Sequence, residues 1–356
     1  MNMTPEISVI MSVYNGEQYL EETIDSVLSQ TFRNWELIVI NDCSTDSTAD
    51  ILKRYAEMDE RIKVHTNEVN LRLPTSLNKA ISLSTGKYIA RMDADDICLP
   101  ERFEKQYKFM EENKDISLSS CRFMTLKNGM YAPGGCGGRC DHDALKAMLL
   151  VTNPILHPGV IAKSEVMKKL CYDTTLTCTE DLELWTRMIT DGQKIAIMPE
   201  FLLIYRLHDK QITSTTLDRQ HTEVLKIQQK YYRDLVGQMS DEMQKFYISG
   251  IYFKENADTE KFREFAKWLK SESRKSFKKD IIEYALFEML AEYKRCGISK
   301  KEIIKTMLTF SKVFIVKEII RRKQNAKNDL KKFCKATEKL GLRQVSGTKE
   351  FPIYSK

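Results

Sequence analysis

The chain has 356 residues, of which 42% are hydrophobic and 30% are charged, and its formal net charge is +6. This length and composition indicate a globular protein with a buried core, and no apolar stretch reaches the roughly 18 to 20 uncharged residues that a membrane span needs. The N-terminus does not resemble a signal peptide, and the nine cysteines follow no regular framework, so we expect a cytoplasmic protein with free thiols.

The first hundred residues alternate between strand patterns and helix patterns. Apolar runs predict strands at 7–14, 35–40, 62–65 and 88–92, and amphipathic stretches predict helices at 19–29, 47–56 and 75–84. This alternation predicts an α/β fold with a parallel sheet covered on both faces, in which ligands bind beyond the carboxyl ends of the strands. Polar clusters at Tyr14-Asn15, at Asn41-Asp42 and at 93–96 follow three of these strands, so we expect them to converge on one crevice.

Three carboxylates end the fourth predicted strand. Asp93, Asp95 and Asp96 crowd acidic oxygens at one point, and hard cations such as Mn²⁺ or Mg²⁺ prefer oxygen ligands. Carboxylates this close would raise each other's pKa unless a positive charge lay between them. The pattern therefore predicts a cation site. The alternative is a solvated acidic turn that caps the helix starting near Pro100.

The alternation loosens after residue 112. A helix is predicted at 101–112 and a strand at 116–124, followed by a Gly-rich connection at 127–139, a short strand near 160–161 and a helix from 164. Two more strands are predicted at 194–198 and 202–206, and the first unit should close near residue 214. Cys136, Cys140 and His142 suggest zinc, but the spacing is irregular and a fourth ligand is missing, so we favour a flexible loop.

A second acidic pair lies about ninety residues after the first. Glu180 and Asp181 open a predicted helix, whose dipole stabilises an ionised carboxylate at its N-terminus, and either group could accept a proton from an attacking hydroxyl. His208 follows a strand and could join Asp93 and Asp95 in holding a cation that neutralises a diphosphate. Asp42 could accept a hydrogen bond from a uracil N–H, and Tyr14 offers a ring for the base; capping or packing is the alternative for each.

The C-terminal part has a different composition. Helices are predicted at 220–236, 241–250, 257–271, 278–296 and, with one break, at 300–340. Residues 301–340 contain twelve Lys or Arg and four Asp or Glu, a local net charge of +8. This basic amphipathic stretch either lies on an anionic membrane surface or packs on its own helices. Nucleic acid is not an expected partner, because the stretch lacks interleaved exposed aromatics and a recognisable module.

Six sequence blocks, in order, closely resemble the bacterial family 2 glycosyltransferases with a GT-A fold, of the capsular polysaccharide and O-antigen type. The blocks lie at residues 7–16, 26–32, 41–46, 90–96, 179–187 and 205–208, so the resemblance covers about the first 210 residues. Ala90-Arg-Met-Asp-Ala-Asp-Asp96 carries the Asp-X-Asp motif of the family. Ser12 and Cys43 depart from the pattern, since many relatives have Pro and Gly there.

The resemblance implies an inverting glycosyltransferase that uses Mn²⁺ or Mg²⁺. Its donor would be a UDP-sugar of the glucose, galactose or N-acetylhexosamine type, and its acceptor a hydroxyl of a glycan, lipid-linked in our expectation. Position by position, it implies the following roles: Asp181 as general base, Tyr14, Asp42, Arg91, Asp93 and Asp95 for the donor, Asp93, Asp95 and His208 for the metal, Glu180 and Trp185 on the acceptor side, and Arg72 and Lys79 near the donor.

The resemblance ends near residue 214, so we expect a catalytic domain at 1–214 and a helical, basic region at 215–356 that attaches to the acceptor or to a membrane. The protein would then be cytoplasmic, with a peripheral site on the inner face of the cell membrane. A second hypothesis is a nucleotide-sugar-binding or scaffold protein of the same fold that has lost catalysis. A nucleotidyltransferase would need a Gly-rich phosphate loop after the first strand, and only Asn15-Gly16 is present there.

Overall fold

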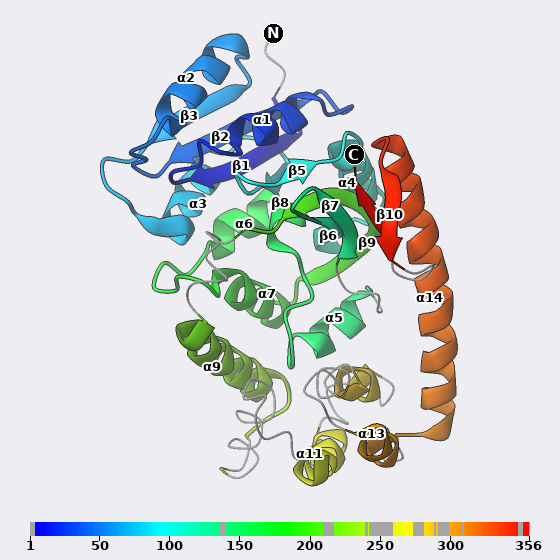
Figure 1. The fold of residues 1–356 in the computed structure, drawn as a ribbon. Helices are drawn as coiled ribbons and strands as arrows, with labels where there is room; N and C mark the ends of the chain where they lie inside the picture. The colour runs from blue at the N-terminus through cyan, green and yellow to red at the C-terminus, as the bar shows by residue number, and fades with distance from the viewer. Residues whose placement is uncertain are drawn as a thin grey trace.

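The computed structural model describes residues 4–134, 140–208, 217–238, 241, 259–272, 281–287, 290, 299–307, 310–347 and 352–355. One sheet runs through the upper part of the molecule, and helices of the C-terminal half lie below it (Figure 1). A long helix, α14, runs along one side from these lower helices back to the sheet (Figure 1). No helix among the described residues is long and apolar enough to span a bilayer.

The N-terminal half of the sheet has the predicted parallel alternation. Its strands are β1 (Ile7–Val13), β2 (Trp35–Asn41), β3 (Ile62–Thr66) and β4 (Tyr88–Arg91), and they lie side by side in the order β4-β1-β2-β3. Between them come α1 (Leu20–Leu28), α2 (Thr48–Met58) and α3 (Arg72–Leu83). Every residue of β2 is buried, as expected for a central strand covered on both faces.

The second half of the sheet mixes directions. Its strands are β5 (Ile97–Cys98), β6 (Ile116–Lys127), β7 (Met130–Gly134), β8 (Ile161–Lys163) and β9 (Lys194–Arg206), and its helices are α4 (Arg102–Glu112), α5 (His142–Met148), the 3-10 turn η1 (His157–Gly159), α6 (Ser164–Leu170) and α7 (Glu180–Thr190). β8 pairs antiparallel with β4 and β6, and β9 runs parallel to β6. The strands predicted at 194–198 and 202–206 are one strand, β9. It stays paired with β6 along this length, with shifts in register that take up the irregularities.

The Gly-rich connection contains structure that the sequence reading missed. β6 and β7 form a hairpin whose turn residues, Asn128 and Gly129, both have positive φ, at 51° and 74°. Asn-Gly is the residue pair that such a two-residue turn favours. Strand β7 therefore occupies part of the stretch that we expected to be loop. Of the suggested zinc ligands, Cys136 lies outside the described residues, and the His142 Nδ1 accepts a hydrogen bond from the backbone N–H of Ile195.

The C-terminal part is helical over most of its described length, as expected. Its helices are α9 (Leu217–Leu235), α11 (Thr259–Glu272), α13 (Lys300–Met307) and α14 (Lys312–Lys339), and the predicted break falls between α13 and α14. The chain then forms a hairpin of β10 (Arg343–Gly347) and β11 (Pro352–Ser355), in which Tyr354 pairs with Tyr131 of β7. The last helix ends at Lys339, close to the predicted 340, and the two strands beyond it, which extend the edge of the sheet, were not predicted.

One hydrophobic cluster joins the two halves of the chain. It extends from Ile10 of β1 through Trp185 of α7 to Tyr231 of α9 and Phe262 of α11. A smaller cluster holds the far end of α14 on the sheet, where the Phe333 ring has no exposed surface and contacts the rings of Phe201 and Tyr354. The predicted boundary at 214 falls within the undescribed residues 209–216, and the division into two domains stays a prediction.

Candidate active site

The acidic cluster lies where β4 ends. One carboxylate oxygen each from Asp93, Asp95 and Asp96 lies within 4.8 Å of the others, and no other group of three metal-ligand side chains occurs among the described residues. The alternative that these carboxylates cap a helix is wrong. Helix α4 begins only at Arg102, after β5, and its N-cap residue Glu101 makes no side-chain cap. The cluster therefore has no capping role to explain it.

Asp96 is the buried member of this cluster, and hydrogen bonds hold it in place. It is fully buried; its Oδ1 accepts from the backbone N–H of Arg206 at 2.9 Å, and its carbonyl accepts from the Thr23 hydroxyl at 2.8 Å. Its Oδ2 is buried and has no hydrogen-bond partner among the described residues. Burial, together with the charges of Asp93 and Asp95, raises the pKa of Asp96 well above its ordinary value. Three carboxylates this close, one of them with a buried oxygen that has no partner among the described residues, offer donors that a divalent cation could use.

Asp93 is paired with Arg91. The Arg91 guanidinium, 2% exposed, donates from Nη1 to Asp93 Oδ2 at 2.5 Å and forms a second contact with Oδ1. Burial raises the pKa of Asp93, the charge of Arg91 lowers it, and the charges of Asp95 and Asp181 raise it. Arg91 also acts electrostatically on Glu180. Arg91 therefore pairs with the first acidic site and acts electrostatically on the second, which the sequence separates from it by almost ninety residues.

His208 lies against the acidic cluster, as predicted. Its Nε2 is 2.8 Å from Asp95 Oδ2, and its ring packs beside Tyr19 with centroids 5.2 Å apart. Arg206 fixes this segment, because its Nε donates to the Asp95 carbonyl at 2.8 Å and its guanidinium lies over the Tyr19 ring. A hollow of about 680 Å³ borders His208, between α1 and the β6–β7 turn. The imidazole therefore has open space on one side and a carboxylate on the other.

The turn after β1 links the three predicted polar clusters. The Asn15 backbone N–H donates to the Ser44 hydroxyl at 3.0 Å, and the Asn15 Oδ1 accepts from the Thr45 N–H at 2.9 Å. A Cβ added at Gly16 would lie 3.9 Å from the Cβ of Ala94, so this turn also borders the acidic loop. The expectation that the clusters converge is confirmed by these contacts.

Asp42 lies in a network of hydrogen bonds just beyond the end of β2. It is 2% exposed, and its Oδ1 accepts from Asn67 Nδ2 at 2.7 Å and from the Leu71 N–H at 2.9 Å. Lys79 donates to the other end of Asn67, at 2.7 Å. Tyr14, in contrast, has 53% of its surface exposed, which leaves its ring accessible to a ligand. Asp42 is thus held in one orientation, and Lys79 acts on it through Asn67.

Three residues of this region have positive φ: Asn15, at 52°, Cys43 and Arg72. Cys43 has a φ of 63°, in the region where glycine carries no steric cost. This explains why Gly suits the position in the related sequences. Arg72 has a φ of 68° at the start of α3, and its side chain is exposed.

The second acidic pair opens helix α7, as predicted. Asp181 is half-buried; its Oδ2 accepts from Asn153 Nδ2 at 2.7 Å and its Oδ1 from the Leu182 N–H at 2.6 Å. Burial raises the pKa of Asp181, whereas the bonds from Leu182 and Asn153 lower it. Glu180 is 5% exposed, its Oε2 has no partner among the described residues, and burial raises its pKa to about 7. Of the two, Asp181 is the accessible and oriented carboxylate.

A buried group of rings supports this acidic pair. His157 Nε2 lies 2.7 Å from the Tyr172 hydroxyl, and its Nδ1 lies 3.9 Å from Glu180 Oε1. Burial and the charge of Arg91 lower the pKa of His157 well below its ordinary value, so the ring is neutral. Trp185 packs edge-on against His157 and has no exposed surface. The structure therefore does not support acceptor contact by Trp185, which is a core residue; Glu180 is likewise buried.

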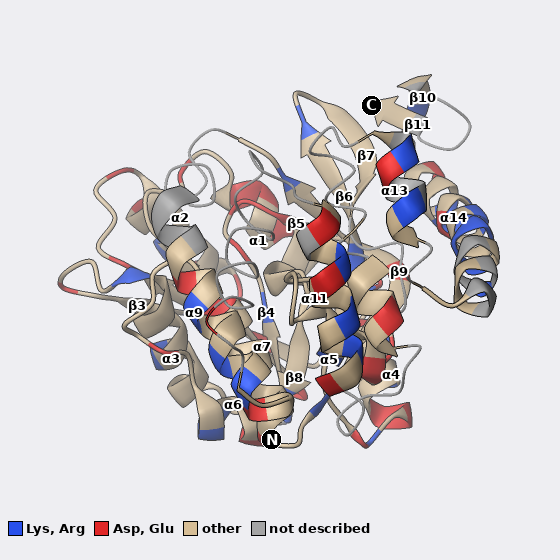
Figure 2. Cartoon of the chain, turned by 90° about the horizontal axis from the view of Figure 1, so that it is seen from below, with Lys and Arg blue, Asp and Glu red and all other residues tan. Residues whose placement is uncertain are grey.

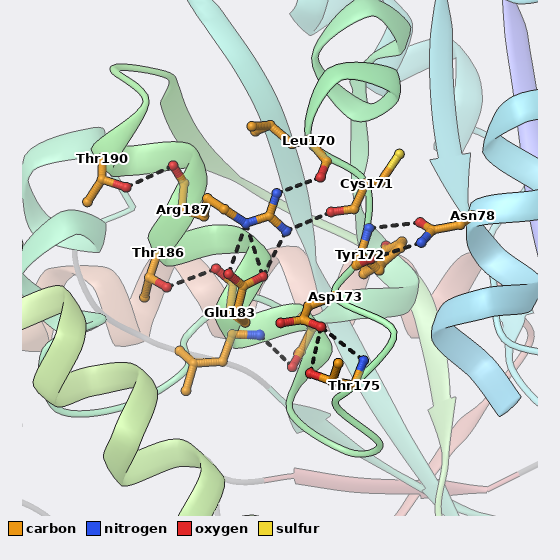
Figure 3. A network of polar contacts seen from close by, with 12 residues as sticks. Asn78, Leu170, Cys171, Tyr172, Asp173, Thr175, Glu183, Thr186, Arg187 and Thr190 are labelled. Atoms are coloured by element: carbon orange, nitrogen blue, oxygen red, sulfur yellow. Dashed lines mark hydrogen bonds and ion pairs between the residues drawn. The ribbon is translucent and has the colours of Figure 1, made fainter.

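A polar network fixes the segment that carries Tyr172 (Figure 3). Arg187 of α7 donates to the carbonyls of Leu170 and Cys171 at 2.5 and 2.7 Å, and Glu183 holds its guanidinium by an ion pair. Asn78 of α3 brackets the Tyr172 backbone with hydrogen bonds of 2.9 and 2.8 Å. These contacts join α3, α6 and α7 around the acidic pair.

Several residues of the site carried no role in the sequence reading. Asp96 was named only with its neighbours, Arg206 only within a motif, and no role was given to Asn153, His157 and Tyr172. The only sequence signal for these roles was the stretch 153–158, in which Asn153 and His157 each precede a proline.

Comparison with known proteins bears on the family. Residues 8–162 match the profile of the family described as Glycosyl transferase family 2. The O-antigen biosynthesis glycosyltransferase WbnJ of Escherichia coli is 34% identical to this chain.

 The alignment with WbnJ spans 221 residues, which are 59% of this chain and 83% of the relative. The putative teichuronic acid biosynthesis glycosyltransferase TuaG of Bacillus subtilis is 33% identical over 219 residues, which are 60% of this chain and 83% of that protein.

The chain belongs to glycosyl transferase family 2.

A solved structure confirms the GT-A fold expected for this family 2 glycosyltransferase. The S. aureus TarS 1–349 structure in complex with UDP-GlcNAc superposes with a TM-score of 0.56 at 17% identity, covering 82% of this chain and 90% of TarS 1–349. At this identity the likeness shows the fold alone. The fold accounts for the position of the acidic cluster at the carboxyl end of β4.

Proposed function

We propose that this family 2 glycosyltransferase moves a sugar from a UDP-sugar to a hydroxyl of a glycan acceptor, with inversion at the sugar carbon, in the synthesis of a cell-surface polysaccharide. One observation carries the proposal. The acidic cluster, in which a buried oxygen of Asp96 has no partner among the described residues, contains Asp93, and the oriented carboxylate of Asp181 lies near enough to Asp93 to act on its charge. A transferase needs these two functions: a site for the leaving diphosphate and a base for the nucleophile.

The acidic cluster fits a divalent cation. Asp93 and Asp95 would hold it together with His208, whose Nε2 already lies 2.8 Å from Asp95 Oδ2, and Asp96 would hold the loop in shape through Arg206 and Thr23. A bound Mn²⁺ or Mg²⁺ would stabilise the negative charge that develops on the diphosphate. Oxygen and imidazole donors suit either ion, so the donor set does not choose between them.

The residues beyond β1 and β2 fit a nucleotide. The carboxylate of Asp42, held by Asn67 and the Leu71 N–H, can accept a hydrogen bond from a uracil N–H, and the exposed Tyr14 ring can stack on the base. Arg91 orients Asp93, which we assign to the ribose and the metal. The names of WbnJ and TuaG support a cell-surface glycan as the product.

Asp181 is our candidate for the general base. It begins α7, where the helix dipole favours the ionised form, and the bonds from Leu182 and Asn153 do the same against the cost of burial. An ionised carboxylate can take the proton of the acceptor hydroxyl as this oxygen attacks the sugar carbon from the face opposite to the diphosphate. Glu180 suits this step less well, because it is buried and its pKa of about 7 leaves it largely protonated below neutral pH.

A binding or scaffold protein of the same fold is the alternative. The orientation of the carboxylates favours catalysis: Asp95 contacts His208, Arg91 holds Asp93, and Asn153 holds Asp181, whereas binding alone does not need an oriented base. Calorimetric titration with UDP-glucose, UDP-galactose, UDP-N-acetylglucosamine and GDP-mannose, each with and without Mn²⁺, tests the donor assignment. We expect one UDP-sugar to bind, and to bind more tightly with the metal. Binding of GDP-mannose alone would contradict the UDP assignment.

The Asn153→Ala variant should change the pH dependence of transfer. Asn153 donates to Asp181 and thereby lowers the pKa of its carboxyl, so its removal should raise that pKa further. Activity requires the ionised carboxylate and is lost as the pH falls through its pKa, so the acid limb of the kcat/KM profile should move to higher pH. We expect a loss of about three- to tenfold near pH 7 that recovers at higher pH.

The control for this variant is Asn113→Ala, which removes a side chain that caps the end of α4 far along the chain from the acidic pair. Its pH profile should match that of the unmodified enzyme. An Asn153→Ala profile with an unmoved acid limb would show that Asn153 does not act on the catalytic proton acceptor.

A further inference from the structure

We propose that the outer side of α14 is a docking surface for an anionic membrane, formed by Lys323, Lys327, Lys331 and Lys335. These residues lie four apart, so they share one side of the helix, and all four are exposed. Figure 2 shows Lys and Arg recurring along α14 at the edge of the molecule. We call these four residues the lysine stripe.

The opposite side of α14 packs against the rest of the protein. Phe333 and Thr337 are fully buried there, and Asp329 forms an ion pair with Arg122, which is 6% exposed. Two other basic residues of the helix also face inward onto the fold, since Arg321 lies over the Tyr284 ring and Arg322 over the Phe287 ring. These contacts fix the rotation of the helix, and they leave the lysine stripe facing outward.

The charge of the lysine stripe is not neutralised within the described part of the protein. Lys332 and Lys339 pair with Glu200 and Glu101, whereas no ion pair joins the lysine stripe to an acidic residue among the described residues. The acidic residue nearest along the helix, Asp329, is the inward partner of Arg122. Four exposed lysines in a row attract a surface of negative charge.

A membrane fits this surface better than a nucleic acid does. Ile320 lies one turn before Lys323 on the same exposed side, and 59% of its surface is exposed. A large apolar side chain beside lysines suits the boundary between lipid headgroups and hydrocarbon, into which the side chain can insert while the lysines remain at the headgroups. The exposed side of the helix from 320 to 335 contains no aromatic residue on which a base could stack.

Membrane docking by the lysine stripe is a function separate from the proposed transfer reaction and does not depend on it. Surface attachment would place the catalytic unit beside acceptors that are anchored in a lipid bilayer. Deleting residues 300–356 is a poor test, because the deletion would also remove β10, β11 and the packing of Phe333. Substitution of the exposed lysines avoids this problem, since exposed substitutions outside special contacts change stability little.

The test is co-sedimentation of the full chain with large vesicles of phosphatidylcholine that contain about 30% phosphatidylglycerol, or none, with salt as a second variable. We expect binding to the anionic vesicles at about 0.1 M salt, release at about 0.5 M, and no binding to the neutral vesicles. The variant Lys323→Gln, Lys327→Gln, Lys331→Gln and Lys335→Gln should bind at least about tenfold more weakly, since each lysine near a lipid surface contributes up to about fivefold.

A matched control removes the same charge elsewhere. Lys53, Lys226, Lys230 and Lys267 are exposed lysines on α2, α9 and α11, and their combined replacement by Gln should leave vesicle binding nearly unchanged. Equal losses in both variants would overturn the proposal, as would an unmodified chain that ignores anionic vesicles. Equally tight, stripe-dependent binding of a DNA duplex at the same salt would also overturn the membrane assignment and show a general polyanion site.

Discussion

Replacing Asp181 by Asn is expected to lower the rate of sugar transfer by about 10²- to 10⁴-fold, the range that a general base contributes. The amide has nearly the same shape, so the hydrogen bond with Asn153 can re-form through the amide oxygen, but it cannot accept the proton of an acceptor hydroxyl. Asp181 is bonded to Asn153 and to the Leu182 N–H and not to a residue assigned to the nucleotide, so the affinity for UDP should change little. The measurement is kcat from released UDP, together with a calorimetric Kd for UDP.

The control is Asp191→Asn, at the opposite end of the same helix. Asp191 is the C-cap residue of α7, and its carboxylate forms an exposed ion pair with Lys169, so its loss should leave kcat within about twofold. If Asp181→Asn retained turnover close to that of the control, Asp181 would not be the base. Glu180 would then be the remaining carboxylate of the pair to examine.

Replacing Asp95 by Asn should remove the metal dependence of the enzyme. The Asp95 carboxylate lies within the acidic cluster and contacts His208 at 2.8 Å, so its loss takes away one proposed ligand and releases a second. We expect transfer to fall by at least about 100-fold and UDP binding in the presence of Mn²⁺ to weaken by at least about tenfold. UDP binding without the metal should be nearly unchanged.

The last expectation separates loss of the metal site from loss of the fold. Asp115→Asn serves as the control, since Asp115 is exposed and forms only a surface ion pair with Lys194. Mn²⁺ should tighten UDP binding in this control as it does in the unmodified enzyme. If Mn²⁺ still tightened UDP binding to the Asp95→Asn variant by the same factor, Asp95 would not be a metal ligand.

The sequence predicted the parts of the fold that depend on local pattern. The apolar runs of β1, β2 and β4 are buried on both faces, so hydrophobicity alone marks them. The acidic residues at the end of β4 and at the start of α7 could be found in the same way, because strand ends and helix starts fix where such side chains lie. The position of His208 could be predicted because it follows the end of β9.

Other features depended on contacts between distant residues. Asn153 reaches Asp181 across 28 positions, through the packing of the segment before η1 on α7, and nothing in its own neighbourhood indicates this partner. Strand β11 joins the sheet through the pairing of Tyr354 with Tyr131, which no periodicity near residue 354 reveals. The complete burial of Trp185 was not predicted either, because the sequence motif does not distinguish an aromatic residue at a binding site from one in the core.

The positive φ of Cys43 belongs to the same class of features. Most non-glycine residues avoid this conformation, and the polar cluster at 41–46 did not show which of its residues would adopt it. The loop is held in this shape by a hydrogen bond from the Ser44 N–H to Asn41 and by the bonds that tie Asn15 to Ser44 and Thr45, which lie about thirty positions away.

The most direct test of the proposed reaction is the configuration of the sugar first released from an α-linked UDP-sugar when water replaces the acceptor. Proton NMR with Mn²⁺ present can follow the anomeric signal before the free sugar equilibrates. If Asp181 activates the nucleophile for a single displacement, the β-anomer should form first, and Asp181→Asn should abolish the signal. Initial release of the α-anomer would contradict the inverting mechanism, and equal release with and without metal would contradict the role of the acidic cluster.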